Sequence, residues 1–284
     1  MPLRAPLEIA AIADALGDQS RLFDVDLLEQ CESTNSLLLT RAEAGAASGS
    51  VIVTRHQTAG RGRRGRAWIS EPGESLTFSL LWRLPPGVAP AGLSLAAGLA
   101  VVQAINRVLS AGSSIDASSP RADASPPQTP RLKWPNDILL DGRKLGGILV
   151  ELLPGTAHAA VIGCGLNLSL PGAMPADLRP VSAALSEAEQ QLGIALNPNG
   201  LLAAILVELL QILGQFAREG FASLQDAWMM HDAFCNQAVR VLSEFSPPVD
   251  GICRGVFPDG SLKLEVGGEL RALISGEVSL RLAS

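Results

Sequence analysis

The chain has 284 residues, which is enough for one large domain or for a medium domain followed by a small one. With 47% hydrophobic and 18% charged residues it can bury a substantial core, which excludes an intrinsically disordered chain. The net charge of −6 disfavours a surface that as a whole attracts nucleic acid or an anionic membrane, so a basic segment has to be a local feature.

The part of the chain before residue 131 alternates between apolar patterns and polar breaks. Residues 1–30 hold one short amphipathic pattern, and the polar residues Ser33, Thr34 and Asn35 before three leucines indicate a helix start. Strands are predicted at residues 51–54 and 75–83, and an apolar helix at residues 93–109. Residues 110–131 contain six Ser and four Pro, which predicts a flexible surface insertion.

The part beyond the insertion predicts short strands, two helices and then strands alone. Short apolar runs predict strands at residues 132–134, 138–140, 147–153 and 159–164. Helices are predicted at residues 200–216 and 221–231, and five short strands between residues 239 and 282. We therefore expect an α+β domain over residues 1–235, followed by a small β-barrel over residues 236–284.

The four cysteines, Cys31, Cys164, Cys235 and Cys253, form no CxxC pair and lack the spacing of a zinc site. We predict free thiols in a reducing compartment. No signal peptide is recognisable, and the longest apolar run, residues 201–213, is too short and too interrupted to span a bilayer. The expected location is the cytoplasm, with no membrane partner.

The first segment that indicates chemistry is Gly60–Arg66, which places four arginines within seven residues. Four guanidinium groups repel one another and favour an anion, and glycines let backbone N–H groups approach a phosphate closely. A solvated basic loop or an RNA-contacting segment is the alternative. The phosphate hypothesis is favoured because the segment follows a predicted strand inside a globular domain.

The second segment is Lys133-Trp134-Pro135-Asn136-Asp137. A lysine at a strand end beside Trp and Pro is held still and partly desolvated, which suits it to stabilise charge on a carboxylate or phosphate. Asn136 and Asp137 offer oxygens of the kind that Mg²⁺ prefers. An ordinary turn capped by these two residues is the alternative.

Two glycine-containing segments follow. Gly146 and Gly147 open a buried strand and permit the close approach of a ligand or of another backbone, with a simple β-bulge as the alternative. Asn167 ends the segment Gly163–Asn167, where its amide suits a hydrogen bond either to a base edge or to the backbone of a turn.

Taken in this order, the segments resemble the biotin–protein ligase family. The matching segments are residues 32–35, 57–68, 133–137, 143–151 and 163–167, and residues 251–255 and 276–281 match the small C-terminal domain of the family. The resemblance implies a mixed sheet flanked by helices, as in class II synthetases, followed by an SH3-like barrel. It also implies two half-reactions. Biotin and MgATP give biotinyl-5′-AMP and pyrophosphate, and the biotinyl group then passes to a lysine of a biotin carboxyl carrier domain, such as that of acetyl-CoA carboxylase.

The resemblance also implies residue roles. For biotin it assigns Ser33, Thr34, Asn35 and Gln57 to the ureido ring, and Gly60, Arg61, Gly62, Arg63, Gly146 and Gly147 to its surroundings. For catalysis it assigns Arg63 to the α-phosphate and Lys133 to the activated carboxyl and phosphate oxygens. For ATP it adds Arg66, Trp68, Asn136, Asn167 and Arg254, with Trp68 near the adenine, Asn167 at its edge and Arg254 reaching in from the C-terminal domain. Asp137 is the expected Mg²⁺ ligand.

The chain departs from the family pattern at three places, one of which is the Ser/Pro-rich insertion before Leu132, which is longer than expected. Only about 30 residues precede the first motif, so we expect no DNA-binding module, no repressor function and no DNA partner. Gly146 stands where an alanine is expected. The sequence leaves open whether the chain is a monomer or a homodimer.

Two other functions compete with the ligase hypothesis. A lipoate or octanoyl transferase would share the catalytic fold, but the Arg-rich loop and the C-terminal barrel motif argue against it. A nucleic-acid-binding module would use Gly60–Arg66, but the net charge and the lack of interleaved aromatic residues argue against that function.

Overall fold

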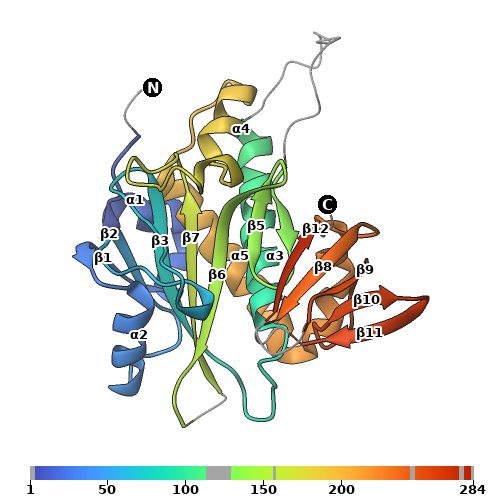
Figure 1. The fold of residues 1–284 in the computed structure, drawn as a ribbon. Helices are drawn as coiled ribbons and strands as arrows, with labels where there is room; N and C mark the ends of the chain where they lie inside the picture. Colours follow the sequence, from blue (N-terminus) through green and yellow to red (C-terminus); the bar gives the residue numbers. More distant parts are fainter. Residues whose placement is uncertain (1–3, 113–128, 156–157, 244–246, 275–277, 283–284) are drawn as a thin grey trace.

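The computed structural model describes residues 4–112, 129–155, 158–243, 247–274 and 278–282 (Figure 1). Its centre is a mixed seven-stranded sheet in which β1 and β2 are parallel and every other neighbouring pair is antiparallel. In sheet order the strands are β1 (Asp24–Cys31), β2 (Ser50–Gln57), β3 (Ser75–Arg83), β7 (Ala159–Asn167), β6 (Arg143–Leu152), β5 (Asp137–Leu140) and β4 (Arg131–Lys133).

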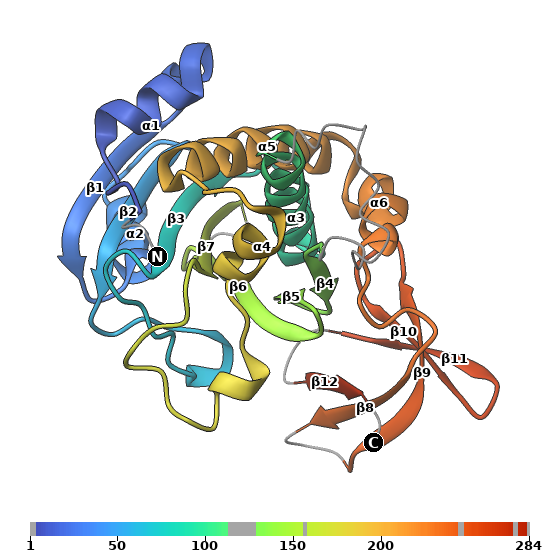
Figure 2. The same ribbon diagram turned by 90° about the horizontal axis from the view of Figure 1, so that it is seen from above.

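Helices cover both faces of this sheet. On one face the long helices α3 (Leu93–Gly112) and α5 (Pro198–Glu219) pack side by side over the main hydrophobic core (Figure 2). On the other face, α2 (Thr34–Glu43) packs over a smaller apolar cluster formed with β2, β3 and β7. The shorter helices are α1 (Ile9–Leu16), α4 (Leu185–Leu192) and α6 (Gln225–Met230).

Strand β3 shows how the sequence specifies these two faces. Its alternate residues Leu76, Phe78 and Leu80 are fully buried in the main core against the long helices. Successive side chains of a strand point to opposite faces, so Thr77 and Ser79 point to the face that carries α2. This second face carries the site described below.

The helices α3 and α5 are long and apolar enough to cross a membrane by length and composition alone. Their most apolar windows are 67% and 50% buried inside the structure, and the two helices contact each other along the core. Both observations are those expected of core helices that pack on a sheet.

A five-stranded antiparallel sheet follows α6 and confirms the predicted change to strands. In sheet order its strands are β11 (Glu269–Leu273), β10 (Leu262–Val266), β9 (Val249–Val256), β8 (Ala238–Ser243) and β12 (Val278–Leu282). Gly255 lies at a φ of 86°, and a Cβ there would overlap the sulfur of Met229, so β9 packs tightly on α6. The predicted α+β class, a helix-flanked mixed sheet and then a small all-β unit, is confirmed.

Two helices or strands of the structure were not predicted from the sequence, and two of the predicted segments lie partly outside the described residues. The missed elements are β1 and α4. The insertion predicted at residues 110–131 lies largely outside the described residues, but α3 continues to Gly112 and β4 begins at Arg131. The last predicted strand began at Glu277, which also lies outside them. All four cysteines are free, as predicted.

Candidate active site

A cavity of about 270 Å³ opens on the sheet face that α2 covers in part. It brings together most of the predicted site residues, from segments more than 130 positions apart in the sequence. Those lining it are Ser33, Thr34, Asn35, Gln57, Arg61, Gly62, Arg63, Arg66, Trp68, Lys133, Asn136, Asp137, Gly147 and Asn167. The predicted residues Gly60, Gly146 and Arg254 are not among the residues that line it.

The floor of the cavity is a row of residues that lie opposite one another on neighbouring strands. From β3 to β4 the row runs through Thr77, Gly165, Gly147, Asp137 and Lys133. Because the second and third residues of this row are glycines, the backbone between Thr77 and Asp137 carries no side chains. The indole of Trp68 lies directly over Gly165, where a Cβ would overlap it.

One end of the cavity is a cluster of neutral polar groups at the start of α2. Ser33 caps the helix, accepting a hydrogen bond from the Ser36 amide at 3.4 Å. The Gln57 Oε1 accepts from the Thr34 backbone N–H at 2.7 Å, which holds this glutamine against the helix start. The Ser79 hydroxyl lies 2.7 Å from Thr34 Oγ1 and 2.5 Å from Asn35 Oδ1. These groups are buried and fixed by one another, and four of them line the cavity, namely Ser33, Thr34, Asn35 and Gln57.

The Arg-rich loop folds back on itself over the cavity. The backbone N–H of Trp68 donates to the Gly60 carbonyl at 2.8 Å, and the backbone N–H of Gly62 donates to the Arg66 carbonyl at 2.7 Å. The loop is attached to β6 because Arg61 donates to both carboxylate oxygens of Glu151, at 2.9 and 2.8 Å. The same carboxylate accepts from Asn35 Nδ2 at 2.8 Å, so Glu151 joins the loop to the polar cluster.

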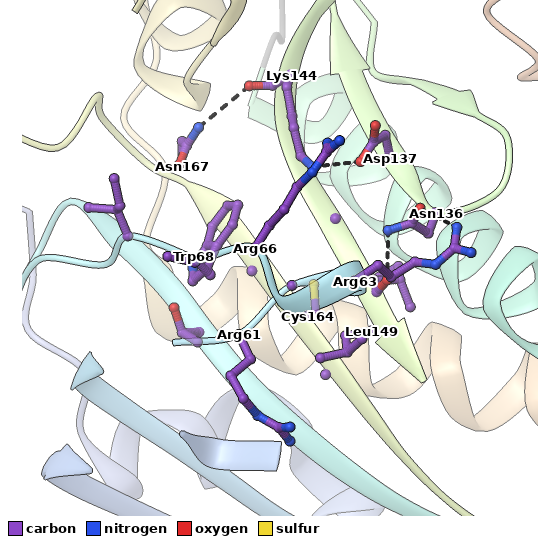
Figure 3. A pocket seen from close by; sticks show the side chains of 18 of the residues that line it. Arg61, Arg63, Arg66, Trp68, Asn136, Asp137, Lys144, Leu149, Cys164 and Asn167 are labelled. Atoms are coloured by element: carbon purple, nitrogen blue, oxygen red, sulfur yellow. Dashed lines mark hydrogen bonds and ion pairs between the residues drawn. The ribbon is translucent and has the colours of Figure 1, made fainter. Parts of the chain in front are cut away.

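The other end of the cavity is a cluster of cations around Asp137 (Figure 3). Its two carboxylate oxygens pair with different lysines, Oδ2 with Lys133 at 3.0 Å and Oδ1 with Lys144 at 2.6 Å. Burial by itself would raise the pKa of Asp137, but Lys144 and Lys133 hold that pKa below its ordinary value. Beside them, Arg63 donates to Asn136 Oδ1 at 3.1 Å, and burial lowers the pKa of this guanidinium.

The cavity has a charge opposite to that of the whole chain. Six of the described residues that line it are basic, namely Arg61, Arg63, Arg64, Arg66, Lys133 and Lys144. One, Asp137, is acidic. In a chain of net charge −6, this concentration of cations marks a site for a multiply charged anion. A neutral polar pocket thus lies at one end of a floor that includes two glycines, and a cation cluster lies at the other.

Three predicted residues lie elsewhere or are already bonded. Arg254 lies on β9, where it donates to Glu265 at 2.7 Å and to Asn236 at 2.6 Å. Among the described residues of the five-stranded sheet, Leu280 lines the cavity. Asn167 lines the cavity, but its Nδ2 donates to the Ala183 carbonyl at 3.0 Å. At Gly146 a Cβ would lie 2.6 Å from Leu166 Cδ2, so this glycine allows the close approach of β7, not of a ligand.

Sequence reasoning missed four residues of this site. Lys144 and Glu151 belong to the matched segment 143–151, and Thr77 and Ser79 belong to the correctly predicted strand at 75–83. The alternation of that strand was the available signal, because it places two hydroxyl residues on one face. The partners of Lys144 and Glu151 depend on the pairing of β6 with other segments, for which one sequence holds no signal.

Comparison with known proteins identifies the class of enzyme that this fold and site define. The sequence model described as the biotin/lipoate A/B protein ligase family matches residues 27–167. The chain is 37% identical to the bifunctional ligase/repressor BirA of Escherichia coli, over 91% of this chain and 74% of that protein. It is 33% identical to the biotin–[acetyl-CoA-carboxylase] ligase of Mycobacterium tuberculosis, over 97% of this chain and 96% of that protein.

Solved structures agree with these sequence relatives. The biotin protein ligase of Aquifex aeolicus in complex with biotin and ATP superposes with a TM-score of 0.75 at 23% identity, covering 92% of this chain and 99% of the other. That of Leishmania major in complex with biotinyl-5-AMP superposes with a TM-score of 0.59 at 25% identity, over 88% and 98%. The chain belongs to the biotin–protein ligase family.

Proposed function

We propose that this ligase activates biotin with ATP to give biotinyl-5′-AMP and pyrophosphate, and then transfers the biotinyl group to a lysine of a biotin carboxyl carrier domain. The observation that carries the proposal is the row from Thr77 to Lys133, in which two glycines separate a neutral polar pocket from a cation cluster. A ligand with an amide-like ring, then an apolar chain and then a terminal carboxylate has its parts in the same order as the polar pocket, the glycine floor and the cation cluster.

The neutral end suits the ureido ring because that ring is uncharged and both donates and accepts hydrogen bonds. Ser33, Thr34, Asn35 and Gln57 offer hydroxyl and amide groups there, and the Glu151 carboxylate that accepts from Asn35 is itself paired with Arg61. The apolar chain would then cross the bare backbone of Gly147 beside Trp68, whose indole already covers Gly165.

The cationic end suits the first half-reaction. A carboxylate oxygen attacks the α-phosphorus, a new P–O bond forms, and the bond to the β-phosphate oxygen breaks, so that pyrophosphate leaves with the electron pair. Two anions have to meet in this step, and fixed cations at the meeting point lower the barrier. Lys133 and Arg63 lie at the buried side of the cluster and are the residues we assign to this charge.

Mg²⁺ enters this proposal as part of the substrate MgATP. Asp137, the expected ligand, pairs with a lysine through each of its two oxygens, which does not fit a carboxylate that also holds a metal ion. Among the described residues no group of three His, Cys, Asp or Glu side chains could hold one either. We therefore derive no step through a metal ion bound by the protein.

The second half-reaction requires that biotinyl-5′-AMP is first protected from water and then exposed to the acceptor lysine. Biotinyl-5′-AMP is a mixed anhydride that water hydrolyses, and the Arg-rich loop folded over the cavity would exclude water from it. The neutral amine of the acceptor lysine then attacks the carbonyl carbon, the bond to AMP breaks so that AMP leaves with the electron pair, and the attacking nitrogen releases one proton to solvent as the amide forms. We propose that the acceptor is the carrier domain of a biotin-dependent carboxylase such as acetyl-CoA carboxylase, in the cytoplasm.

The decisive experiment is a transfer assay with a carrier domain, ATP and either labelled biotin or labelled lipoate, with reactions lacking ATP as controls. We expect ATP-dependent labelling of one lysine by biotin. Labelling of the carrier by lipoate alone would instead assign a lipoate or octanoyl transferase. Salt-sensitive nucleic-acid binding that persists at saturating biotin and ATP would favour the nucleic-acid function of Gly60–Arg66.

A further inference from the structure

Two polar atoms of the cavity are buried without a hydrogen-bond partner among the residues that the structure describes. They are the hydroxyl oxygen of Thr77 and the indole Nε1 of Trp68. Thr77 is 4% exposed, and both residues line the cavity. A buried polar group without a partner is rare in a folded protein and calls for an explanation, and the indole N–H of a buried Trp usually finds an acceptor.

The two atoms belong to the same place on the cavity floor. Thr77 of β3 lies directly opposite Gly165 of β7, so the Thr77 side chain stands on the cavity face beside the bare backbone of Gly165. A Cβ on Gly165 would lie 2.8 Å from Trp68 Nε1, so the indole N–H lies over that same glycine. One donor thus comes from the sheet and the other from the Arg-rich loop.

The hydrogen-bond network of the neutral pocket ends just before this place. Ser79 stands two residues further along β3 on the same face, and its hydroxyl is bonded to Thr34 and Asn35. The hydroxyl of Thr77 takes no part in this network. Residues two apart on a strand are about 6.6 Å apart, so the unpaired donors lie one ring width from the pocket proposed for the ureido group.

We propose that Thr77 and Trp68 form a subsite for the thioether sulfur of biotin, to which the Thr77 hydroxyl and the Trp68 indole N–H donate. The proposal rests on the function proposed above and names a pair of residues that determines specificity for the ligand. In biotin the sulfur-containing ring is fused to the ureido ring. Between the ureido group and the carboxylate, the sulfur is the one atom of biotin that can accept a hydrogen bond.

This subsite predicts how the enzyme discriminates against a ligand that lacks the sulfur. Desthiobiotin keeps the ureido group, the chain and the carboxylate, but it would leave both buried donors unpaired in the complex. A site that is built to donate to a ligand atom rejects the analogue without that atom, because the donors then lose water and gain no acceptor. An analogue with an ether oxygen in place of the sulfur offers a better acceptor than a thioether.

The test combines changes of the residue with changes of the ligand atom. Thr77→Val keeps the shape of the side chain and removes its hydroxyl. We expect its Kd, measured by calorimetry, to rise about threefold for biotin and about tenfold for oxybiotin, and to stay within about twofold for desthiobiotin. Trp68→Phe should likewise narrow the ratio of the Kd values for desthiobiotin and biotin, a ratio that cancels effects common to both ligands.

Two variants serve as matched controls. Thr77→Ser keeps the hydroxyl and should retain the wild-type ratio of the two Kd values. Thr40→Val makes the same change as Thr77→Val on the exposed side of α2 and should alter no Kd. Because no bond to a described residue is lost, unliganded Thr77→Val should melt at the wild-type temperature or above it.

The possible contrary results have different meanings. An equal loss of affinity for biotin and desthiobiotin in Thr77→Val would place the hydroxyl at the ureido ring or the chain, and unchanged Kd values for all three ligands would show that it touches none of them. A lower melting temperature of unliganded Thr77→Val would give the hydroxyl a structural role. Each of these results overturns the sulfur subsite alone, whereas a wild-type protein that binds neither biotin nor its analogues would refute the proposed function.

Discussion

The indole Nε1 of Trp134 donates a hydrogen bond of 3.0 Å to the carbonyl oxygen of Gly260, in the turn between β9 and β10. Trp134 is 1% exposed and directly follows Lys133 in the chain. On the other side of that lysine, the Leu132 N–H donates to the His231 carbonyl at 2.8 Å, just before the chain enters the five-stranded sheet. The lysine of the first half-reaction is therefore held between two contacts with the C-terminal part of the chain.

We predict that Trp134→Phe lowers both stability and adenylate formation. The change keeps most of the buried apolar surface but leaves the Gly260 carbonyl without its donor, at a cost of about 1 kcal/mol. Urea unfolding measures the first effect and biotin-dependent pyrophosphate release the second. Trp82→Phe is the matched control, because the Nε1 of Trp82 has no hydrogen-bond partner in the described part of the chain. Equal effects of the two variants would contradict a specific role of the Trp134 contact.

Gly165→Ala is predicted to damage substrate binding more than folding. The added Cβ would overlap the indole of Trp68, which has to move from its place over the cavity floor. We expect the Kd for biotin, measured by calorimetry, to rise at least tenfold, a change of about 1.4 kcal/mol. Gly200→Ala in α5, where the nearest heavy atom would be 4.0 Å away, should keep full affinity and stabilise the protein slightly. A Gly165→Ala variant with wild-type affinity would refute the assigned path of the biotin chain.

The ion pair between Arg61 and Glu151 predicts how well the enzyme retains its intermediate. Glu151→Gln weakens the attachment of the loop to β6 and the contact to Asn35, so the loop should open more often. We expect faster release of biotinyl-5′-AMP, detected as biotinylation of lysines on a bystander protein, and faster amide exchange over residues 60–66. Glu29→Gln, at the exposed Arg55 pair, should change neither. Retention equal to wild type would show that this pair does not keep the loop closed.

Asp232 predicts a pH dependence of stability that is separate from catalysis. Burial raises its pKa to about 6, against about 3.9 for an ordinary aspartate, although the Phe234 N–H and the Cys253 thiol donate to it. The folded protein thus binds more protons than the unfolded chain between these values, and this group's contribution to stability falls as pH rises from about 4 to 6.

Replacing Asp232 by Asn should therefore flatten that decline. We expect Asp232→Asn to gain on wild type as pH rises through this window, by about 3 kcal/mol at most above pH 6, because the neutral amide still accepts from Phe234. Unfolding free energies at pH 4, 5 and 7 measure the difference, with exposed Asp177→Asn as control. A gap between Asp232→Asn and wild type that does not change with pH would disprove the shift.

How much the sequence could predict depended on whether a pattern was local. Strand β3 was predicted at its observed bounds because small polar and apolar residues alternate from Ser75 to Leu80. Strand β1 was missed because it lies at the sheet edge, is only half-buried, and carries Asp24, Asp26 and Glu29 among its eight residues. A strand with one polar, exposed side and acidic residues shows too little hydrophobic alternation to be recognised.

The residues of the site also differ in whether a local pattern could predict them. Motif residues such as Lys133 and Arg63 were found because their types indicate their chemistry. The partners that fix them were not, because Lys144 meets Asp137, and Glu151 meets both Arg61 and Asn35, only through pairing of β6. Asn167 and Arg254 were predicted to bind ATP, but in the structure they donate hydrogen bonds to Ala183 and to Glu265. Their own segments hold no signal for these partners.

The row from Thr77 to Lys133 also makes the site selective for the length of its ligand. Neighbouring strands are about 4.8 Å apart, so the backbones of Thr77 on β3 and Lys133 on β4 are held about 19 Å apart by a sheet that cannot stretch. A carboxylic acid with one methylene more or fewer would keep its ring in place and present its carboxylate at the wrong depth. Selection between homologous acids would then follow from hydrogen-bonded backbone geometry, which a change of side chain cannot easily relax.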